Sequence, residues 1–367
     1  MIVIGVDSHK RSHVLAAVDA ATGRVIVVRA VPADGKGTLA AWRWAHRLDP
    51  ERVWAIEDCR QVSGRLERAL IGHGERVVRV APKLMERARR RERAPGKSDP
   101  IDATAAARAA LREGIETLPA AFLDERALQL RLLSDHRADL VAERTRHQNR
   151  LRWHLVELDS ELEARLPARA LDRACWQRRI ARRLGRMAPS ARVRIARDEL
   201  HRIRELSRAE RALERELGAL IARLNPELLA ERGIAVLTAA TLVGHVAGAQ
   251  RFASDGHFAR HAGAAPIPAS SGNSQRVRLN RGGDRQLNRA LHTIAITRAR
   301  IDPQTRAYLQ RKLAEGKTRR EALRCLKRHL ARRVYHLLYR PLSSTPPPST
   351  TTRPINLNTP IHIPCLT

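Results

Sequence analysis

The first 80 residues carry the pattern that most restricts the fold. Three short segments, residues 2–6, 13–18 and 24–31, are rich in β-branched side chains, and the turn-like sequence AATG separates the second from the third. Such segments predict strands joined as antiparallel hairpins. Helix-like and strand-like segments then alternate, with helices near 37–47 and 63–72 and strands near 53–57 and 76–80. We therefore expect a mixed α/β sheet with its first strand at the centre, in a domain that ends near residue 115.

A helical region follows, in which charged side chains surround regularly spaced leucines. The leucines form two sets, spaced three or four residues apart. The first set is Leu151, Leu155, Leu158, Leu162 and Leu166, and the second is Leu213, Leu217, Leu220 and Leu224. This heptad-like repeat predicts either an antiparallel helical hairpin or a dimerising coiled coil. Both interpretations leave arginine-rich faces available for contact with nucleic acid.

The remainder of the chain combines compact helices with one very polar loop. Residues 268–285 read PASSGNSQRVRLNRGGDR. Amphipathic helices are expected at 284–300 and 318–339, and the Pro- and Thr-rich tail after Arg340 is expected to be disordered. We therefore divide the chain into domains at 1–115, 116–228 and 229–340, with the tail at 341–367.

The charge balance indicates an anionic partner. The chain has 69 Lys and Arg residues against 38 Asp and Glu residues, a formal net charge of +31. The planar arginine guanidinium fits phosphate well, so we expect binding to nucleic acid. We find no signal peptide and no apolar run of the about 18 residues that a membrane span needs, so no membrane partner is expected. The four cysteines are far apart, which disfavours a zinc module and fits a reduced cytoplasmic setting.

Four acidic residues stand at the ends of predicted elements in the first domain. Asp7 ends the first strand, Glu57 ends the fourth, and Asp99 and Asp102 begin a later helix. Because the carboxyl ends of neighbouring parallel strands meet at one sheet edge, these acids can converge. Clustered carboxylates repel one another unless a cation neutralises them, and their oxygen ligands suit Mg²⁺. Two such ions would activate an attacking oxygen and stabilise a leaving one. Taken singly, Asp7 is also typical of a turn at a strand end, Glu57 of a surface charge, and Asp99 with Asp102 of a cap at a helix N-terminus.

The polar loop and the residues after Asp7 each leave two interpretations open. The loop is either a solvated basic connector or a phosphate-binding surface in which a serine hydroxyl does chemistry. Its arginines, which either hold phosphate or are merely solvated, are Arg276, Arg278, Arg281 and Arg285. His9 and Lys10 either touch substrate or are ordinary polar residues at a strand end.

Taken together, these motifs resemble the DEDD transposases of the insertion sequence 110 family. The motifs are GVDSHK around Asp7, IE at Glu57, GKSDPIDATAAARAAL around Asp99 and Asp102, and the segment GHFARHAGAAPIPASSGNSQRVRLNRGGDRQLNRALH. The resemblance extends from residue 1 to about 340. It implies a ribonuclease H-like, RuvC-type catalytic domain, then a helical coiled-coil region, then a compact helical C-terminal transposase domain that contains the serine loop.

The resemblance also implies a chemistry. Asp7, Glu57, Asp99 and Asp102 match the catalytic, metal-binding DEDD tetrad, with two Mg²⁺ ions per site as the implied cofactor. The family's nucleophilic serine lies in an SG element, which makes Ser271 the expected nucleophile and Ser270 the reserve. The implied function is a DNA transposase or recombinase, guided in many members by a structured RNA. A homodimer or homotetramer associated with the nucleoid in the cytoplasm is the expected state.

Two other functions stay open at this point. A RuvC-type structure-specific nuclease would use the same carboxylates with water, and a catalytically dead relative would only bind nucleic acid. The sequence departs from the family at three places: Asp58, Cys59 and Arg60 follow the second acid where small residues are usual, Ala235 replaces a usual glycine, and the tail after Arg340 has no counterpart.

Overall fold

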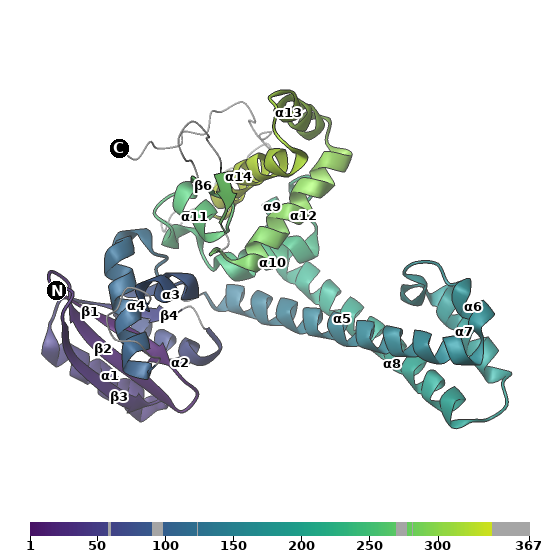
Figure 1. The fold of residues 1–367 in the computed structure, drawn as a ribbon, viewed down its shortest axis with the longest axis horizontal. Coiled ribbons are helices and arrows are strands. Elements are labelled where there is room, and N and C mark those ends of the chain that lie inside the picture. Colours follow the sequence, from purple (N-terminus) through teal and green to yellow (C-terminus); the bar gives the residue numbers. More distant parts are fainter. Residues whose placement is uncertain (58–59, 90–97, 123, 269–276, 281, 340–367) are drawn as a thin grey trace. The chain divides into compact units, whose positions relative to one another are not determined.

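The computed structural model describes residues 1–57, 60–89, 98–122, 124–268, 277–280 and 282–339 (Figure 1). The chain divides into two compact units. The first contains Met1–Ala127, Ala230–Ile234 and His245–Thr367, and the second contains Leu128–Leu229 and Ala235–Gly244. The tail expected to be disordered lies outside the described residues. No helix in the described part is long and apolar enough to cross a bilayer.

A five-stranded mixed sheet forms the N-terminal part of the first unit (Figure 1). Its strands are β1 (Ile2–Ser8), β2 (Ser12–Asp19), β3 (Val25–Pro32), β4 (Arg52–Glu57) and β5 (Val77–Val80). β2 pairs antiparallel with β1 and β3, whereas β4 pairs parallel with β1 and β5. The order β3-β2-β1-β4-β5 confirms the predicted mixed sheet with its first strand at the centre.

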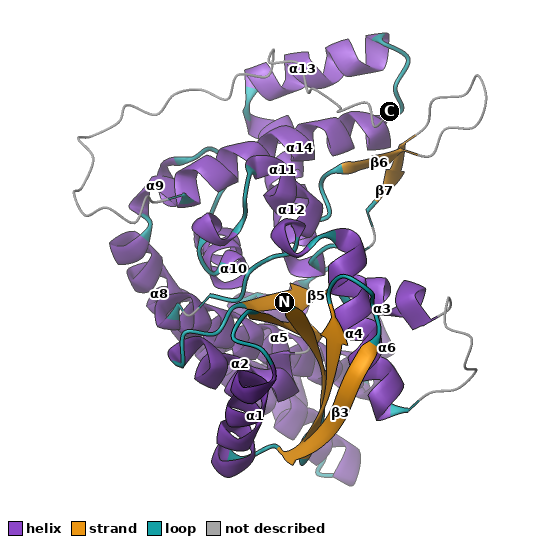
Figure 2. Ribbon diagram, turned by 90° about the vertical axis from the view of Figure 1, so that its left-hand side faces the viewer, coloured by secondary structure: helices purple, strands orange, loops and turns teal. Residues whose placement is uncertain are grey.

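Helices cover both faces of this sheet (Figure 2). They are α1 (Gly35–Leu48), α2 (Arg60–Gly72), α3 (Pro82–Arg89) and α4 (Asp99–Glu113). Ile4 belongs to the cluster that packs against α1 and α2, together with Trp44. Val3 belongs to the cluster on the other face, together with Ala106 of α4. Since successive side chains of a strand point to opposite faces, Asp7 shares the α4 face with Val3.

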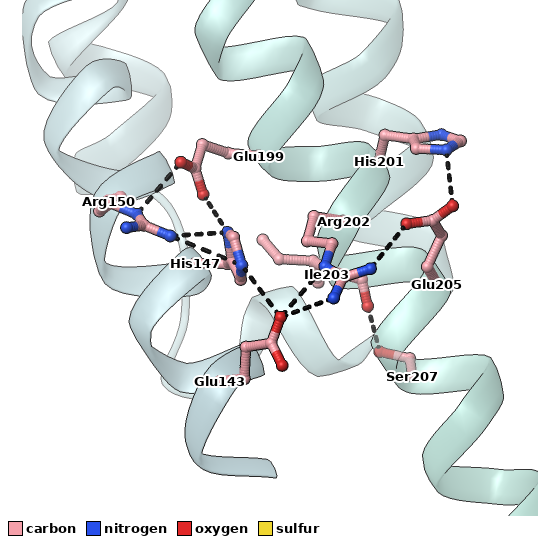
Figure 3. Close-up of polar contacts among 9 residues, drawn as sticks. All are labelled: Glu143, His147, Arg150, Glu199, His201, Arg202, Ile203, Glu205 and Ser207. Atoms are coloured by element: carbon pink, nitrogen blue, oxygen red, sulfur yellow. Dashed lines mark hydrogen bonds and ion pairs between the residues drawn. The ribbon is translucent and has the colours of Figure 1, made fainter. Parts of the chain in front are cut away.

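Two long antiparallel helices make up most of the second unit. They are α5 (Glu125–Leu158) and α8 (Ala191–Leu224); shorter segments complete the region, namely α6 (Ser160–Ala164), η2 (Ala170–Asp172), α7 (Ala174–Gly185), α9 (Pro226–Ala230) and α10 (Val236–Val246). Ion pairs join the long helices (Figure 3). Nδ1 of His147 lies 2.6 Å from a carboxylate oxygen of Glu199, and Arg202 contacts Glu143 at 2.7 Å.

The first set of spaced leucines does not form one continuous seam, so that part of the sequence prediction is wrong. Helix α5 ends at Leu158, and the side chain of Asp159 then accepts a hydrogen bond from the backbone of Leu162 to start α6. Leu162 and Leu166 therefore leave the line of α5. They still pack in the same apolar cluster as Leu151 and Leu155 of α5, together with Ile180 of α7.

A helical subdomain forms the C-terminal part of the first unit. Its elements are η3 (Ala249–Arg251), α11 (Asp255–His261), β6 (Pro266–Pro268), β7 (Val277–Leu279), α12 (Arg285–Ile301), α13 (Pro303–Ala314) and α14 (Arg319–Leu338), and η1 (Ile115–Thr117) follows α4 in the same unit. Helix α14 packs against α11, α12 and α13. The helices predicted at 284–300 and 318–339 are α12 and α14, whereas α13 was not predicted. Its signal is Asp302, which caps the helix, followed by Pro303 in the first turn.

Candidate active site

Helix α4 lies very close to strand β1. A Cβ atom at Gly5 would lie 1.9 Å from the carbonyl oxygen of Ala103 and 2.7 Å from the amide nitrogen of Ala107. Only a residue without a side chain permits this approach. The first turn of α4 contains Asp99 and Asp102. The close packing at Gly5 therefore brings these two acids toward the C-terminal end of β1.

Asp7 and Glu57 end neighbouring parallel strands on the same side of the sheet. The register pairs Val6 of β1 with Ile56 of β4, so the residues that follow are adjacent. Neighbouring strands lie about 4.8 Å apart. Ala55 packs in the cluster on the α4 face, and alternation places Glu57 on that face too. Strands β1 and β4 and helix α4 thus each supply acids to one end of the sheet.

His9 joins this acidic group. Its Nε2 lies 3.1 Å from Oδ2 of Asp7 and 3.4 Å from Oδ1 of Asp99. One ligand atom from each of these three residues lies within 4.8 Å of the other two. The Asp7 side chain is 8% exposed and that of Asp99 56% exposed, so the group opens to solvent on the side of Asp99.

The surroundings of Asp7 favour a cation beside it. Burial raises the pKa of the Asp7 carboxyl above its ordinary value, while the charge of His9 opposes the rise. The nearby charges of Asp102 and Asp99 raise this pKa further. A positive ion among these carboxylates would offset their repulsion, which adds to the effect of burial.

The donor set fits a hard divalent ion. Mg²⁺ binds oxygen at about 2.0–2.1 Å, so two oxygens on one ion lie at most about 4.2 Å apart. The ligand atoms of Asp7, His9 and Asp99 already lie within 4.8 Å, so small side-chain rotations would suffice. Among the residues that the structure describes, this is the one group of three or more side chains suited to a metal ion. The carboxylates of Asp7 and Asp99 are the ligands of choice, because Mg²⁺ prefers oxygen to nitrogen.

The expected serine loop connects two short strands. β6 and β7 pair antiparallel, which fixes the two ends of the loop. Four of the predicted residues lie outside the described part of the chain: Ser270, Ser271, Arg276 and Arg281. Arg278 belongs to β7, and Arg285 is the exposed first residue of α12. The roles of these serines and arginines stay predictions.

An asparagine and a buried lysine support the start of this hairpin. Asn288 of α12 donates hydrogen bonds from Nδ2 to the carbonyl oxygens of Ala262 and Gly263, at 3.1 and 2.8 Å. Lys327 of α14 is buried and donates from Nζ to Oδ1 of Asn288 at 2.5 Å. Burial lowers the pKa of the Lys327 ammonium to about 8, and the charge of Arg324 adds to the effect.

A charged aspartate fixes the start of α12. Oδ1 of Asp284 accepts hydrogen bonds from the backbone of Gln286 and Leu287, and Oδ2 lies 3.0 Å from Nδ1 of His245. Although burial raises the pKa of the Asp284 carboxyl, the hydrogen bond and charge of His245 outweigh it and hold the pKa well below its usual range. The backbone just before this cap is also tightly packed, since a Cβ atom at Gly283 would lie 2.4 Å from the amide nitrogen of Gly263.

Comparisons with known proteins match two separate parts of this chain. A DEDD-type IS110 transposase model matches residues 4–159, and a model of the IS116/IS110/IS902 transposase family matches residues 226–310. An uncharacterized 43.6 kDa protein of insertion element IS110 from Streptomyces coelicolor is 31% identical over 271 residues, which cover 62% of this chain and 67% of that protein. The chain belongs to the IS110 family of transposases.

Other similar proteins cover more of the chain. An uncharacterized 42 kDa protein of insertion element IS900 from Mycobacterium paratuberculosis is 28% identical over 80% of this chain and 86% of that protein. An uncharacterized 44.8 kDa protein of insertion element IS116 from Streptomyces clavuligerus is 27% identical over 95% of this chain and 98% of that protein. Among solved structures, T. thermophilus RuvC in complex with Holliday junction substrate matches 33% of this chain and 99% of that chain, at 16% identity and a TM-score of 0.27.

In this IS110-family transposase, the sequence left the role of His9 open, since it was either a substrate contact or an ordinary polar residue at a strand end. The structure places its side chain between Asp7 and Asp99. Asn288 and Lys327, which support the start of the hairpin, carried no signal in the sequence. A lysine in an amphipathic helix usually faces solvent, and only the packing of α14 buries this one.

Proposed function

We propose that this transposase cuts and rejoins DNA at a composite site. One half is the tetrad Asp7, Glu57, Asp99 and Asp102, and the other is the serine loop, with Ser271 as the nucleophile and Ser270 as the reserve. The observation that carries the proposal is the packing of α4 on β1, which gathers acids from separate elements at one end of the sheet. Such a cluster in a chain of net charge +31 suits a metal-assisted reaction of a phosphodiester.

The proposed reaction is a transesterification. The Ser271 hydroxyl gives up its proton as its Oγ attacks the phosphorus of a DNA phosphodiester and forms a phosphoserine bond. The bond from phosphorus to the leaving strand breaks, and the released oxygen takes up a proton in exchange. A strand hydroxyl later attacks the phosphoserine and frees the serine, so each bond broken is replaced by a bond of the same kind. Mg²⁺ held by the tetrad, two ions per site, would lower the pKa of the attacking hydroxyl and stabilise the charge on phosphate.

The arginines of the serine loop complete the proposed site. Arg276, Arg278, Arg281 and Arg285 would hold the phosphate that the serine attacks, because a guanidinium offers two parallel donors to phosphate oxygens. Contacts of this kind position the backbone without reading the base sequence.

A search for the covalent intermediate tests the proposal. Wild type and the variants Ser271→Ala, Ser270→Ala and Asp7→Asn are incubated with element-end DNA, target DNA, the RNA that copurifies with the protein and Mg²⁺, and a denaturing gel resolves protein joined to DNA. We expect the adduct with wild type and Ser270→Ala, and less than about 1% of it with Ser271→Ala or Asp7→Asn, because the nucleophile or a metal ligand is lost. An adduct with Ser271→Ala would contradict the assignment. Cut DNA without an adduct from any variant would favour the water-using nuclease.

We further propose that a structured RNA guides the reaction and that the active form is a homodimer or homotetramer. The family resemblance and the arginine-rich composition support the RNA, since base pairing would then supply the sequence recognition that phosphate contacts lack. Sequencing of nucleic acid that copurifies with the protein tests this, and recovery of no enriched structured RNA would count against it. Light scattering measures the mass of the protein in solution. A mass of 41.2 kDa would indicate a monomer and contradict the proposed assembly.

A further inference from the structure

A long, strongly basic stretch of the chain surrounds α7. Residues 165–197 contain eleven arginines and a single acidic residue, Asp172. This segment includes α7 and the first residues of α8, at one end of the hairpin that α5 and α8 form (Figure 1). So large a local excess of charge requires either solvent and counterions or an anionic partner.

Helix α7 has one apolar face and one arginine face. Ile180 and Leu184 are fully buried in the cluster that also contains Leu200 of α8. The exposed arginines on the outer side are Arg178, Arg179, Arg182, Arg183 and Arg186. Residues 178, 182 and 186 are spaced by four, so they form a row along one side of the helix, each about 6 Å further along the axis.

Most of these arginines have no acidic partner. Arg183 pairs with Asp159 at 2.5 Å, and Arg179 lies over the ring of Trp176 at 5.1 Å. Within the described chain, no ion pair involves Arg178, Arg182 or Arg186. Arginines of the long helices differ in having acidic partners, since Arg202 of α8, for example, forms an ion pair with Glu143 of α5 (Figure 3). The charge of α7 is therefore available to a ligand.

Side chains of α8 hydrogen-bond to the backbone of α7. Arg197 of α8 donates to the carbonyl oxygen of Leu184 at 2.7 Å, and Arg204 donates to that of Gln177 at 2.9 Å. Gln177 is itself buried and donates to the carbonyl oxygen of Leu171 at 2.7 Å. A helix fixed in this way loses little backbone freedom when its outer face binds a partner, which favours affinity.

We propose that the outer face of α7, formed by Arg178, Arg179, Arg182 and Arg186 and named here the α7 arginine face, docks on the phosphate backbone of duplex DNA. The choice of DNA rests on the proposed function. A helix of 12 residues is about 18 Å long, and it fits against the major groove of B-form DNA, about 12 Å wide, with phosphates on both sides. The deep, narrow major groove of A-form RNA does not admit a helix in this way.

Other partners fit this face less well. A bilayer surface would take large apolar side chains beside the basic ones, and none of the exposed large hydrophobic residues of the described chain lies on α7. A second copy of this chain would have to offer a concentration of unpaired acids, which a protein with 38 acidic against 69 basic residues is poorly able to supply.

Salt-dependent DNA binding tests the proposal. The triple variant Arg178→Gln, Arg182→Gln, Arg186→Gln is compared with Arg165→Gln, Arg192→Gln, Arg202→Gln, which removes the same charge from exposed arginines that already have acidic partners. All proteins also carry Asp7→Asn, so that binding is measured without cleavage. The affinity for a 30-base-pair duplex of arbitrary sequence is measured by fluorescence anisotropy between 50 and 300 mM KCl, beside an RNA duplex of equal length.

We expect the α7 variant to lower the slope of log affinity against log salt by about 2.7, since each lost phosphate contact is worth about 0.9. The control variant should lower it by less than about 1. Equal losses in both variants would overturn the proposal, because only net charge would then matter. A loss confined to the RNA duplex would also overturn it. If the slope changes as expected but no covalent adduct forms in the gel assay, the DNA-binding face stands and the serine chemistry fails.

Discussion

At the scale of single residues, His9 decides how the acidic cluster responds to a metal ion. Its Nε2 lies within hydrogen-bonding reach of Asp7 and close to Asp99, in the position where a cation would neutralise both. Mg²⁺ prefers oxygen ligands to an imidazole nitrogen. We therefore interpret His9 as a competitor of the metal ion and not as a ligand.

The variant His9→Ala tests this interpretation. Without His9, the carboxylates of Asp7 and Asp99 lose a competing partner. A hydrogen bond is worth about 1 kcal/mol net, so Mn²⁺, used in place of Mg²⁺, should bind roughly fivefold more tightly to the variant. Titration of free Mn²⁺ by electron paramagnetic resonance measures the affinity, and Lys10→Ala is the control for a neighbouring residue. Weaker Mn²⁺ binding by His9→Ala would identify His9 as a ligand instead.

At the scale of elements, the contact between α4 and β1 holds the acids together. The variant Gly5→Ala places a methyl group where Ala103 and Ala107 leave no room, so α4 must move away from the sheet. We expect a loss of about 1–3 kcal/mol in the free energy of unfolding, as for other overpacked cores. Because Asp99 and Asp102 move with the helix, Mn²⁺ affinity should fall as well.

The control for this prediction is Gly72→Ala, since a Cβ atom at Gly72 would meet nothing within 4 Å apart from its chain neighbours and the nearby backbone of its own helix. Urea unfolding and Mn²⁺ titration are measured on both variants. If Gly5→Ala kept the Mn²⁺ affinity of wild type, the position of α4 would not depend on this contact, and the acids would have to be gathered by other interactions.

The sequence predicted some of these elements but not the contacts that depend on packing between distant segments. Short segments rich in β-branched residues predicted the strands, and the acids at strand ends predicted where Asp7 and Glu57 lie. Both predictions depend only on local composition and on one topological rule. The path of Leu162 and Leu166 was not predictable from spacing, since a local cap at Asp159 ends α5. The bond between Lys327 and Asn288 joins residues that only the packing of α14 on α12 brings together.

At the scale of the whole molecule, the surplus of positive charge acts on folding and on binding in opposite ways. With 69 basic and 38 acidic residues, the net charge of +31 leaves many arginines that repel one another in the folded chain. Salt screens this repulsion over about 10 Å at 0.1 M, and it also screens the surface ion pairs, which contribute only about 0–1 kcal/mol each. Because repulsion extends over the whole molecule while each pair acts locally, we expect the repulsion to dominate.

Raising KCl from 50 to 300 mM should therefore raise the midpoint of thermal unfolding while it weakens DNA binding. Differential scanning fluorimetry gives the first quantity and anisotropy the second, on the same protein. An uncharged solute such as glycerol at equal osmolality serves as the control, because it changes hydration without screening charge. A midpoint that falls with KCl would show that ion pairs such as Arg137 with Glu210 and Arg144 with Glu210 outweigh the repulsion. The stability of the helical hairpin would then depend on its internal charge pairs, and the unpaired arginines of α7 would make no difference to it.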